Sequence, residues 1–205
     1  MIQSIKEKTT SIFDDVVDLR RYFHSYPELG FEEYKTTQKI QAAMDSIGAK
    51  RLECPTSTGC IYELDTRKPG RTVVLRGDID ALPLQEDLKR KVHSQTDGKM
   101  HACGHDGHTA IVLGVANIIS EYLDDLVGRF VFLFQPAEEL LGGARKMIEG
   151  GALDVIKGDV LLSHHLAAPL DTGTLYFRKG LTMSCLLYTS PSPRDATLSR
   201  MPSSA

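Results

Sequence analysis

The sequence predicts an α/β fold in which helices cover both faces of a mostly parallel sheet. Segments with apolar residues at helical spacing alternate with short apolar runs along the 205 residues. Some of these runs are apolar at nearly every position, which is typical of strands buried on both faces. With 41% hydrophobic and 25% charged residues, the chain can form a substantial core.

Two helices and two strands are expected in the first 76 residues. Helical spacing predicts one helix over residues 2–26, ending before Pro27, and a second over 33–47. Strand-like runs follow at 59–64 and 71–76. A short turn separates these runs, which favours their antiparallel pairing.

The second part of the chain continues the alternation of helices and strands. Its longest helix is apolar nearly all round, which predicts deep packing. The expected elements are this helix at about 106–123, buried strands at 129–134 and 159–163, a short helix around 144–149, and a candidate strand at 174–177.

Residues 186–205 break this pattern. The segment is rich in serine and proline and has no apolar period, so it cannot bury enough surface to fold. It is also similar to the translated adaptor tails of truncated sequencing reads. We therefore expect a non-native or disordered tail.

The composition argues against several classes of partner. The net charge is −3 with mixed signs along the chain, unlike a nucleic-acid binder, and no apolar run approaches the roughly 20 residues of a membrane span. The start lacks the apolar core of a secretory signal, and the four cysteines lack tight spacing, which favours a reducing, cytoplasmic compartment. Cys54 and Cys60 are then ordinary thiols, with a disulfide as the minor alternative.

Acidic and histidine residues lie where three predicted strands end, the edge at which open α/β sheets gather ligands. Taken singly, the acids are typical of turns or helix starts, and the histidines of a polar sheet edge. In chain order the pairs are Asp78 and Asp80, Glu138 and Glu139, and His164 and His165.

A fourth cluster opens the long helix, with three histidines and Cys103 within eight residues. Cys103 alone is compatible with a small buried thiol. Cys103 and His105 can both turn inward, because Gly104 between them carries no Cβ. Thiolate, imidazole and carboxylate groups bind zinc and similar divalent ions, so the four clusters together predict a shared metal site.

The adjacent acids Glu138 and Glu139 allow a division of labour, because neighbouring side chains project differently. One can bind a metal while the other faces a metal-bound water, whose pKa falls to about 7. The second carboxylate can take that proton and return it to a leaving amine. These residues predict cleavage of an amide by a metal-bound hydroxide.

The motifs resemble those of the aminoacylase and carboxypeptidase-type di-metal peptidases. The most similar branch contains hippurate hydrolases, indole-acetyl-amino-acid hydrolases and N-acyl-amino-acid amidohydrolases. The resemblance covers roughly residues 10–185. It rests on the segments His24 to Glu33, Arg76 to Pro83, Met100 to Ala110 and Gln135 to Glu139.

This resemblance implies two divalent metal ions and a role for each motif residue. Cys103 is expected to bridge the ions, His105 to bind one, Glu139 to bind the other, and Glu138 to act as general base. Zinc or manganese is the expected metal, with cobalt or nickel as alternatives.

Three further residues are placed by the resemblance. His165 lies eight residues before Gly173, which fits the family's register and favours it over His164 as a ligand. Asp80 is expected to orient a ligand from the second layer of the site. His24 belongs either to the pocket edge or, at least as readily, to a helix cap or the core.

The resemblance also implies that residues 1–185 are the N-terminal part of a zinc-peptidase-like metallohydrolase catalytic domain, truncated before an inserted lid domain. A further histidine ligand, the lid and its homodimer surface are expected downstream. The parent protein is expected to hydrolyse small N-acyl amino acids or aminoacyl conjugates, and the fragment to be inactive.

Two other functions are compatible with parts of this pattern. A non-catalytic metal-binding module would keep the ligands only, and Glu138 beside Glu139 counts against it because metal binding does not need the extra acid. A thiol enzyme would use Cys103 as nucleophile and His105 as base. A bound ion distinguishes these two, since a nucleophilic cysteine needs none.

Overall fold

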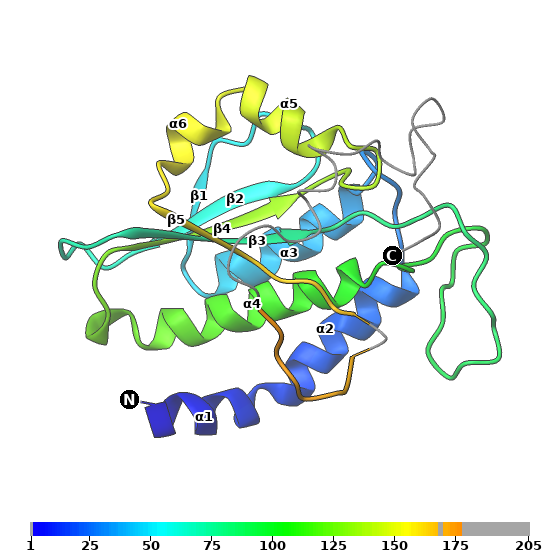
Figure 1. The fold of residues 1–205 in the computed structure, drawn as a ribbon, viewed down its shortest axis with the longest axis horizontal. Helices are drawn as coiled ribbons and strands as arrows, with labels where there is room; N and C mark the ends of the chain where they lie inside the picture. The colour runs from blue at the N-terminus through cyan, green and yellow to red at the C-terminus, as the bar shows by residue number, and fades with distance from the viewer. Residues whose placement is uncertain (1, 168–169, 178–205) are drawn as a thin grey trace, which may run out of the picture. The chain divides into compact units, whose positions relative to one another are not determined.

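A five-stranded mixed sheet lies at the centre of the unit formed by residues 1–167 (Figure 1). The computed structural model describes residues 2–167 and 170–177. The elements are α1 (Ile2–Ser11), α2 (Phe13–Ser25), α3 (Tyr34–Ser46), β1 (Lys50–Leu52), β2 (Cys60–Asp65), β3 (Thr72–Asp78), α4 (His105–Glu121), the 3-10 helix η1 (Leu123–Asp125), β4 (Arg129–Gln135), α5 (Gly143–Glu149), α6 (Ala152–Ile156) and β5 (Val160–Ser163).

The strands are ordered β1-β2-β4-β3-β5 across the sheet. Strands β4, β3 and β5 run parallel, whereas β2 is antiparallel to both of its neighbours. The predicted α/β fold with helices on both faces is confirmed, and parallel pairings are two of the four in the sheet.

The expected pairing of 59–64 with 71–76 is wrong, because β4 lies between these strands. Phe132 of β4 faces Tyr62 on the antiparallel side and Leu75 on the parallel side. The run Arg129–Gln135 is apolar at five consecutive positions. A strand at the centre of the sheet is covered on both faces, so this position buries the apolar side chains of β4 on both sides.

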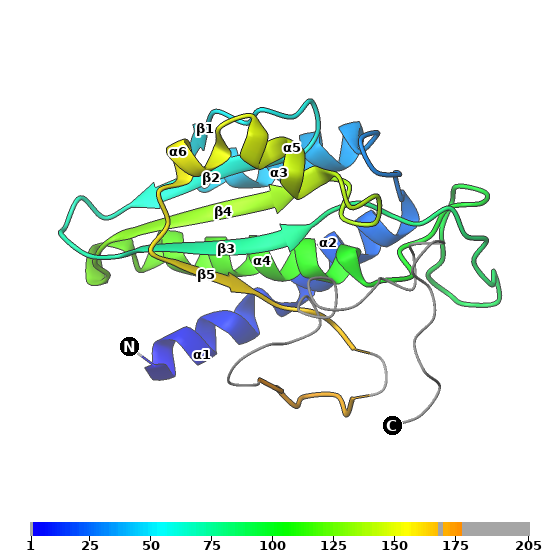
Figure 2. The ribbon, with the colours of Figure 1, turned by 45° about the horizontal axis from the view of Figure 1, so that its top comes forward.

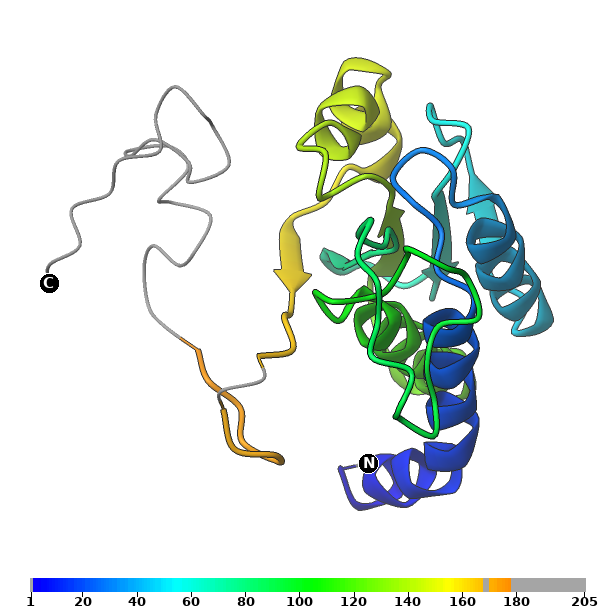
Figure 3. The same ribbon diagram turned by 90° about the vertical axis from the view of Figure 1, so that its right-hand side faces the viewer.

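Each face of the sheet packs against its own set of helices, as Figures 2 and 3 show. Alternate residues of β2 separate the two cores, since Tyr62 faces one and Ile61 the other. The first core joins the sheet to α2, α3 and α4 and contains residues such as Phe23, Ile40, Met44, Val112 and Phe132. The second joins it to α5 and α6 and contains Ile61, Val74, Val131, Met147, Ala152 and Ile156.

The single helix expected over 2–26 is divided at Ile12 into α1 and α2, and the bend is visible in Figure 1. Ile12 is buried, whereas α1 buries none of its residues. No core therefore holds α1 in line with α2. The predicted helices at 33–47, 106–123 and 144–149 correspond to α3, α4 and α5.

Strand β5 exists where a strand was expected, but the prediction that it is buried is wrong. It lies at the sheet edge, and Leu161 and Leu162 are 59% and 53% exposed. Residues 174–177, where a candidate strand was expected, form no strand. Phe177 is 92% exposed, so no described element packs on this apolar run. The tail expected at 186–205 lies outside the described residues.

The described part of the chain contains no helix long and apolar enough to cross a membrane. Cys54 and Cys60 are free thiols, as predicted. Because β3, β4 and β5 are parallel, their carboxyl ends meet at one edge of the sheet, where the predicted metal ligands follow them.

Candidate metal centre

The loops after β3 and β4 are joined at the carboxyl edge of the sheet. The Ile79 N–H donates to the Gln135 carbonyl over 3.1 Å, which continues the parallel ladder beyond the strands. One step further, the Glu139 N–H donates to Asp80 Oδ2 over 2.9 Å. Asp80 is fully buried and Glu139 is half-buried, so this bond is partly shielded from water and fixes the acid pair relative to β3.

His105 begins α4 and points its ring at the same loops. Gly104 precedes it with a φ of 81°, the left-handed conformation in which glycine meets no Cβ clash. His105 Nδ1 lies 2.8 Å from the Asp80 carbonyl oxygen and 3.2 Å from Asp80 Oδ1. A carbonyl only accepts, so Nδ1 carries the proton. Nε2 then faces two carboxylates, with Asp78 Oδ2 3.6 Å and Glu139 Oε1 3.8 Å away.

The acids around His105 control its protonation in the absence of metal. Burial lowers the pKa of His105, but the hydrogen bond to Asp80 and the nearby charges of Asp78 and Asp80 outweigh burial and raise the pKa to about 11. The same surroundings act on Asp78, where burial raises the pKa, but the His108 hydrogen bond and neighbouring cations hold it well below the usual range. A strong negative field therefore surrounds the His105 ring, as a cation site requires.

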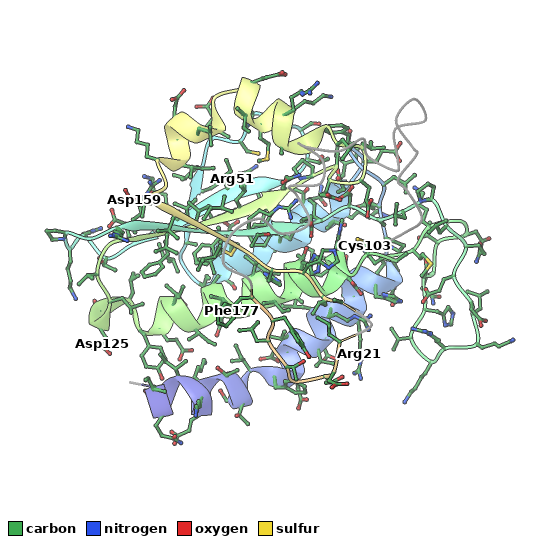
Figure 4. All side chains as sticks on the ribbon, in the orientation of Figure 1. Arg21, Arg51, Cys103, Asp125, Asp159 and Phe177 are labelled. Atoms are coloured by element: carbon green, nitrogen blue, oxygen red, sulfur yellow. The ribbon has the colours of Figure 1, made fainter. Side chains whose placement is uncertain are left out.

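Three predicted ligands converge. One ligand atom each of Cys103, His105 and Glu139 lies within 4.8 Å of the other two. Figure 4 labels Cys103 near the start of α4. A thiol, an imidazole and a carboxylate at this spacing fit a zinc-like divalent ion, because ligand bonds of about 2.0–2.3 Å reach a common centre.

The two histidines after β5 differ in their relation to this group. His165 Nε2 lies 3.4 Å from Cys103 Sγ, and the His165 side chain is exposed. His164 is half-buried, and its Nε2 has no hydrogen-bond partner among the described residues. Burial lowers the pKa of His164. The geometry thus brings His165, the histidine chosen from sequence, to the thiol.

Glu138 is half-buried beside the converging ligands. Burial and the adjacent charge of Glu139 raise the pKa of Glu138 above its usual range. A carboxylate with a raised pKa is a better proton acceptor near neutral pH than an ordinary surface acid.

Sequence reasoning gave no role to His108, which the structure places inside the site. His108 Nδ1 lies 2.6 Å from Asp78 Oδ1, and its Nε2 accepts the Leu166 N–H over 2.8 Å. Atoms of Asp78, His105 and His108 also form a second group within 4.8 Å. His105 and His108 are one helical turn apart on α4, so their spacing alone predicts that both rings lie on the same face of the helix.

His24 lies in the core, one of the three places predicted for it. It is buried, with Nδ1 2.8 Å from Asp106 Oδ2 and Nε2 2.9 Å from Glu86 Oε1. Arg20 Nε also lies 2.8 Å from Asp106 Oδ2. The Asp106 hydrogen bond outweighs burial and raises the pKa of His24. This ionic network joins α2 and the loop before α4 to the first turn of α4.

Amidohydrolases and a metal-binding peptidase are among the known proteins to which the chain is similar. The chain is 44% identical over 174 residues to an N-acyl-L-amino acid amidohydrolase of Geobacillus stearothermophilus, covering 84% of this chain and 46% of that protein. It is 43% identical over 173 residues to IAA-amino acid hydrolase ILR1-like 2 of Arabidopsis thaliana, covering 84% and 39%. The Bacillus subtilis YXEP protein, a dinuclear metal binding peptidase from the M20 family, matches with a TM-score of 0.78 and 38% identity over 83% of this chain and 47% of that one.

The chain spans less than half the length of these relatives. Residues 74–194 match the model of peptidase family M20/M25/M40. That interval contains all six residues predicted for the site, namely Asp80, Cys103, His105, Glu138, Glu139 and His165. The chain therefore belongs to peptidase family M20/M25/M40.

Proposed function

We propose that the protein of which this chain is part is a metal-dependent amidohydrolase that cleaves the amide bond of N-acyl amino acids or small aminoacyl conjugates. The observation that carries the proposal is the convergence of Cys103, His105 and Glu139 beside a half-buried Glu138. The amidohydrolases among the relatives support the same substrate class.

We assign Cys103, His105, Glu139 and His165 as ligands of two divalent ions, with Cys103 between them. The short distance from Cys103 Sγ to His165 Nε2 and the spacing of the other three support this assignment. When bound, the ions would polarise the scissile carbonyl and promote ionisation of the attacking water. Zinc suits this thiolate, imidazole and carboxylate set, and manganese is the second metal proposed.

Glu138 is assigned as the general base, and Asp80 as the residue that orients two ligands. Asp80 holds His105 through Nδ1 and Glu139 through its backbone N–H, which supports the orienting role. Glu138 would take a proton from the attacking water and give it to the leaving amine, so that the acid is regenerated in each cycle.

The remaining part of the proposal concerns the whole protein. We assign residues 1–185 to the N-terminal part of the catalytic domain. A further histidine ligand and a lid domain that forms a homodimer would lie downstream, in a cytoplasmic enzyme. The 205-residue chain by itself would then be inactive.

The test is metal content and hydrolysis of a panel of N-acyl amino acids by the intact gene product. We expect bound divalent metal, turnover that a chelator abolishes, and no turnover by residues 1–205 alone. Metal binding without hydrolysis of any member of the panel would favour the non-catalytic metal-binding module. Full turnover without metal would favour the thiol mechanism and reject the proposal.

A further inference from the structure

We propose that Glu33 is a positioning residue for Glu138, acting through the backbone of Ala137. This inference rests on the proposed function of Glu138 as base. Glu33 Oε1 accepts the Ala137 N–H over 2.8 Å, although the two residues are 104 positions apart. Both residues are fully buried, and Ala137 directly precedes Glu138.

Ala137 has a backbone conformation that needs such support. Its φ is 48°, in the left-handed region, which is unfavourable for a residue with a Cβ. Its carbonyl accepts the Gly143 N–H over 3.1 Å, so the backbone of Ala137 is held from both sides. A Cβ at Gly143 would lie 1.6 Å from the Pro136 carbonyl oxygen, so glycine is required there. The turn that aims Glu138 is therefore strained and closely packed.

The ordinary structural role of Glu33 would be to cap α3, at whose start it stands. Its side chain makes no capping hydrogen bond. The capping acceptor is Glu28 instead, whose carboxylate accepts the Thr36 N–H over 2.7 Å and the Lys35 N–H over 3.2 Å. Since α3 is capped without it, the buried carboxyl of Glu33 serves the Ala137 turn.

The segment that contains Glu33 also holds the other loop of the site. The Ala81 N–H donates to the Glu28 carbonyl over 2.8 Å, and Leu29 forms a parallel bridge with Ala81. Ala81 follows Asp80 in sequence. One N-terminal segment therefore fixes the backbone next to both Asp80 and Glu138, and Glu33 is its only side-chain link to the Ala137 N–H among the described residues.

The test compares two substitutions of Glu33 in the intact, metal-loaded protein. Glu33→Met keeps the volume and removes the acceptor, so we expect kcat to fall about 10- to 100-fold, as for a misplaced catalytic group, with bound metal unchanged. Glu33→Gln retains an oxygen acceptor and should keep kcat within about threefold of the original protein, well below the 10²-fold cost of misplacement. Glu28→Ala is the matched control, because it removes the α3 cap and should lower stability without lowering kcat.

Hydrogen exchange of residues 136–143 gives a second reading that needs no substrate. Glu33→Met should speed exchange of these amides, whereas Glu28→Ala should leave them protected. If Glu33→Met fails to fold, the Ala137 amide of the unaltered protein must still exchange more slowly than exposed loop amides. An unprotected Ala137 amide, or unchanged exchange and kcat in Glu33→Met, overturns the positioning role. If Glu33→Met loses protection at residues 136–143 while the unaltered protein hydrolyses no acyl amino acid, the proposed function is rejected and the positioning of this turn by Glu33 is retained.

Discussion

The two sides of the candidate metal centre are held very differently. The buried side, formed by Asp80, His105 and Glu139, is fixed by three hydrogen bonds, of which the two to His105 are buried. The open side is formed by Cys103 and by His165, an exposed histidine that follows an exposed edge strand. The contrast indicates that the sheet preorganises one half of the site, whereas the other half depends on fewer contacts.

Glu138→Gln should have the largest effect, because it removes the proposed base next to the buried side. We expect kcat of the intact protein to fall by about 10² or more, with metal content unchanged. Steady-state kinetics and metal analysis on the same preparation measure both quantities. Cys103→Ser is the complementary change and should weaken metal binding. A Glu138→Gln protein with metal bound and full activity would show that another group is the base.

Asp80→Ala should have the next largest effect, because Asp80 contacts only the buried side of the site. The substitution leaves the Glu139 N–H without its carboxylate and removes the Oδ1 contact to His105, whose Nδ1 keeps only the Asp80 backbone carbonyl. Loss of such a second-layer partner weakens metal affinity about 10- to 100-fold. Calorimetric titration with zinc measures it, and Asp87→Ala, at an exposed acid in the loop before α4, is the control. Unchanged zinc affinity would mean that the buried side is not preorganised by Asp80.

His108→Asn tests the open side. An asparagine amide can still donate to Asp78. It is too short to accept the N–H of Leu166, the residue that directly follows His165, so this part of the chain loses its bond to α4. We expect zinc affinity to fall about tenfold at most, the lower end of second-layer effects, because His165 is only one ligand. A loss larger than that of Asp80→Ala would reverse the comparison between the two sides.

His24→Gln should have the smallest effect and should depend on pH. The pKa of His24 is raised above 6.5, so its contribution to stability is complete below pH 6.5 and is lost as pH rises through the raised value. The pKa values of Asp106 and Glu86 are lowered despite burial, by their bonds to His24 and to the Ser94 N–H of the loop, so their contribution is lost at acidic pH.

The free energy of unfolding of His24→Gln should therefore be lower than that of the unaltered protein. We expect the difference to be about 1–2 kcal/mol near pH 5.5 and smaller near pH 9. Urea unfolding at both pH values measures the difference. His93→Gln is the control, because His93 bonds the Arg90 carbonyl rather than an acid. An equal deficit at both pH values would show that His24 stabilises the fold by packing alone.

Much of this site follows from local sequence. Cys103, His105 and Glu139 were predicted as ligands, and the structure brings them within 4.8 Å of one another. These residues could be found because each lies next to a strand end or a helix start, and such positions follow from apolar periodicity. The helices α3, α4 and α5 were predictable for the same reason.

Other features depend on contacts between distant segments. The sequence did not indicate that β4 would separate β2 from β3, because strand order depends on how whole strands compete for the covered centre of the sheet. It did not indicate that β5 would be exposed, because an apolar run is the same whether or not a layer covers it. Both outcomes are properties of packing rather than of local propensity.

The sequence by itself determined the α/β class and the strand ends beside which the proposed ligands lie. The resemblance named Asp80 as an orienting residue, but only the tertiary structure decided which groups Asp80 and Glu33 contact. Asp80 meets His105 across 25 positions and Glu33 meets Ala137 across 104. The physical reason is that hydrogen bonds to buried backbone groups form wherever folding brings a donor and an acceptor together, and no sequence period records that distance.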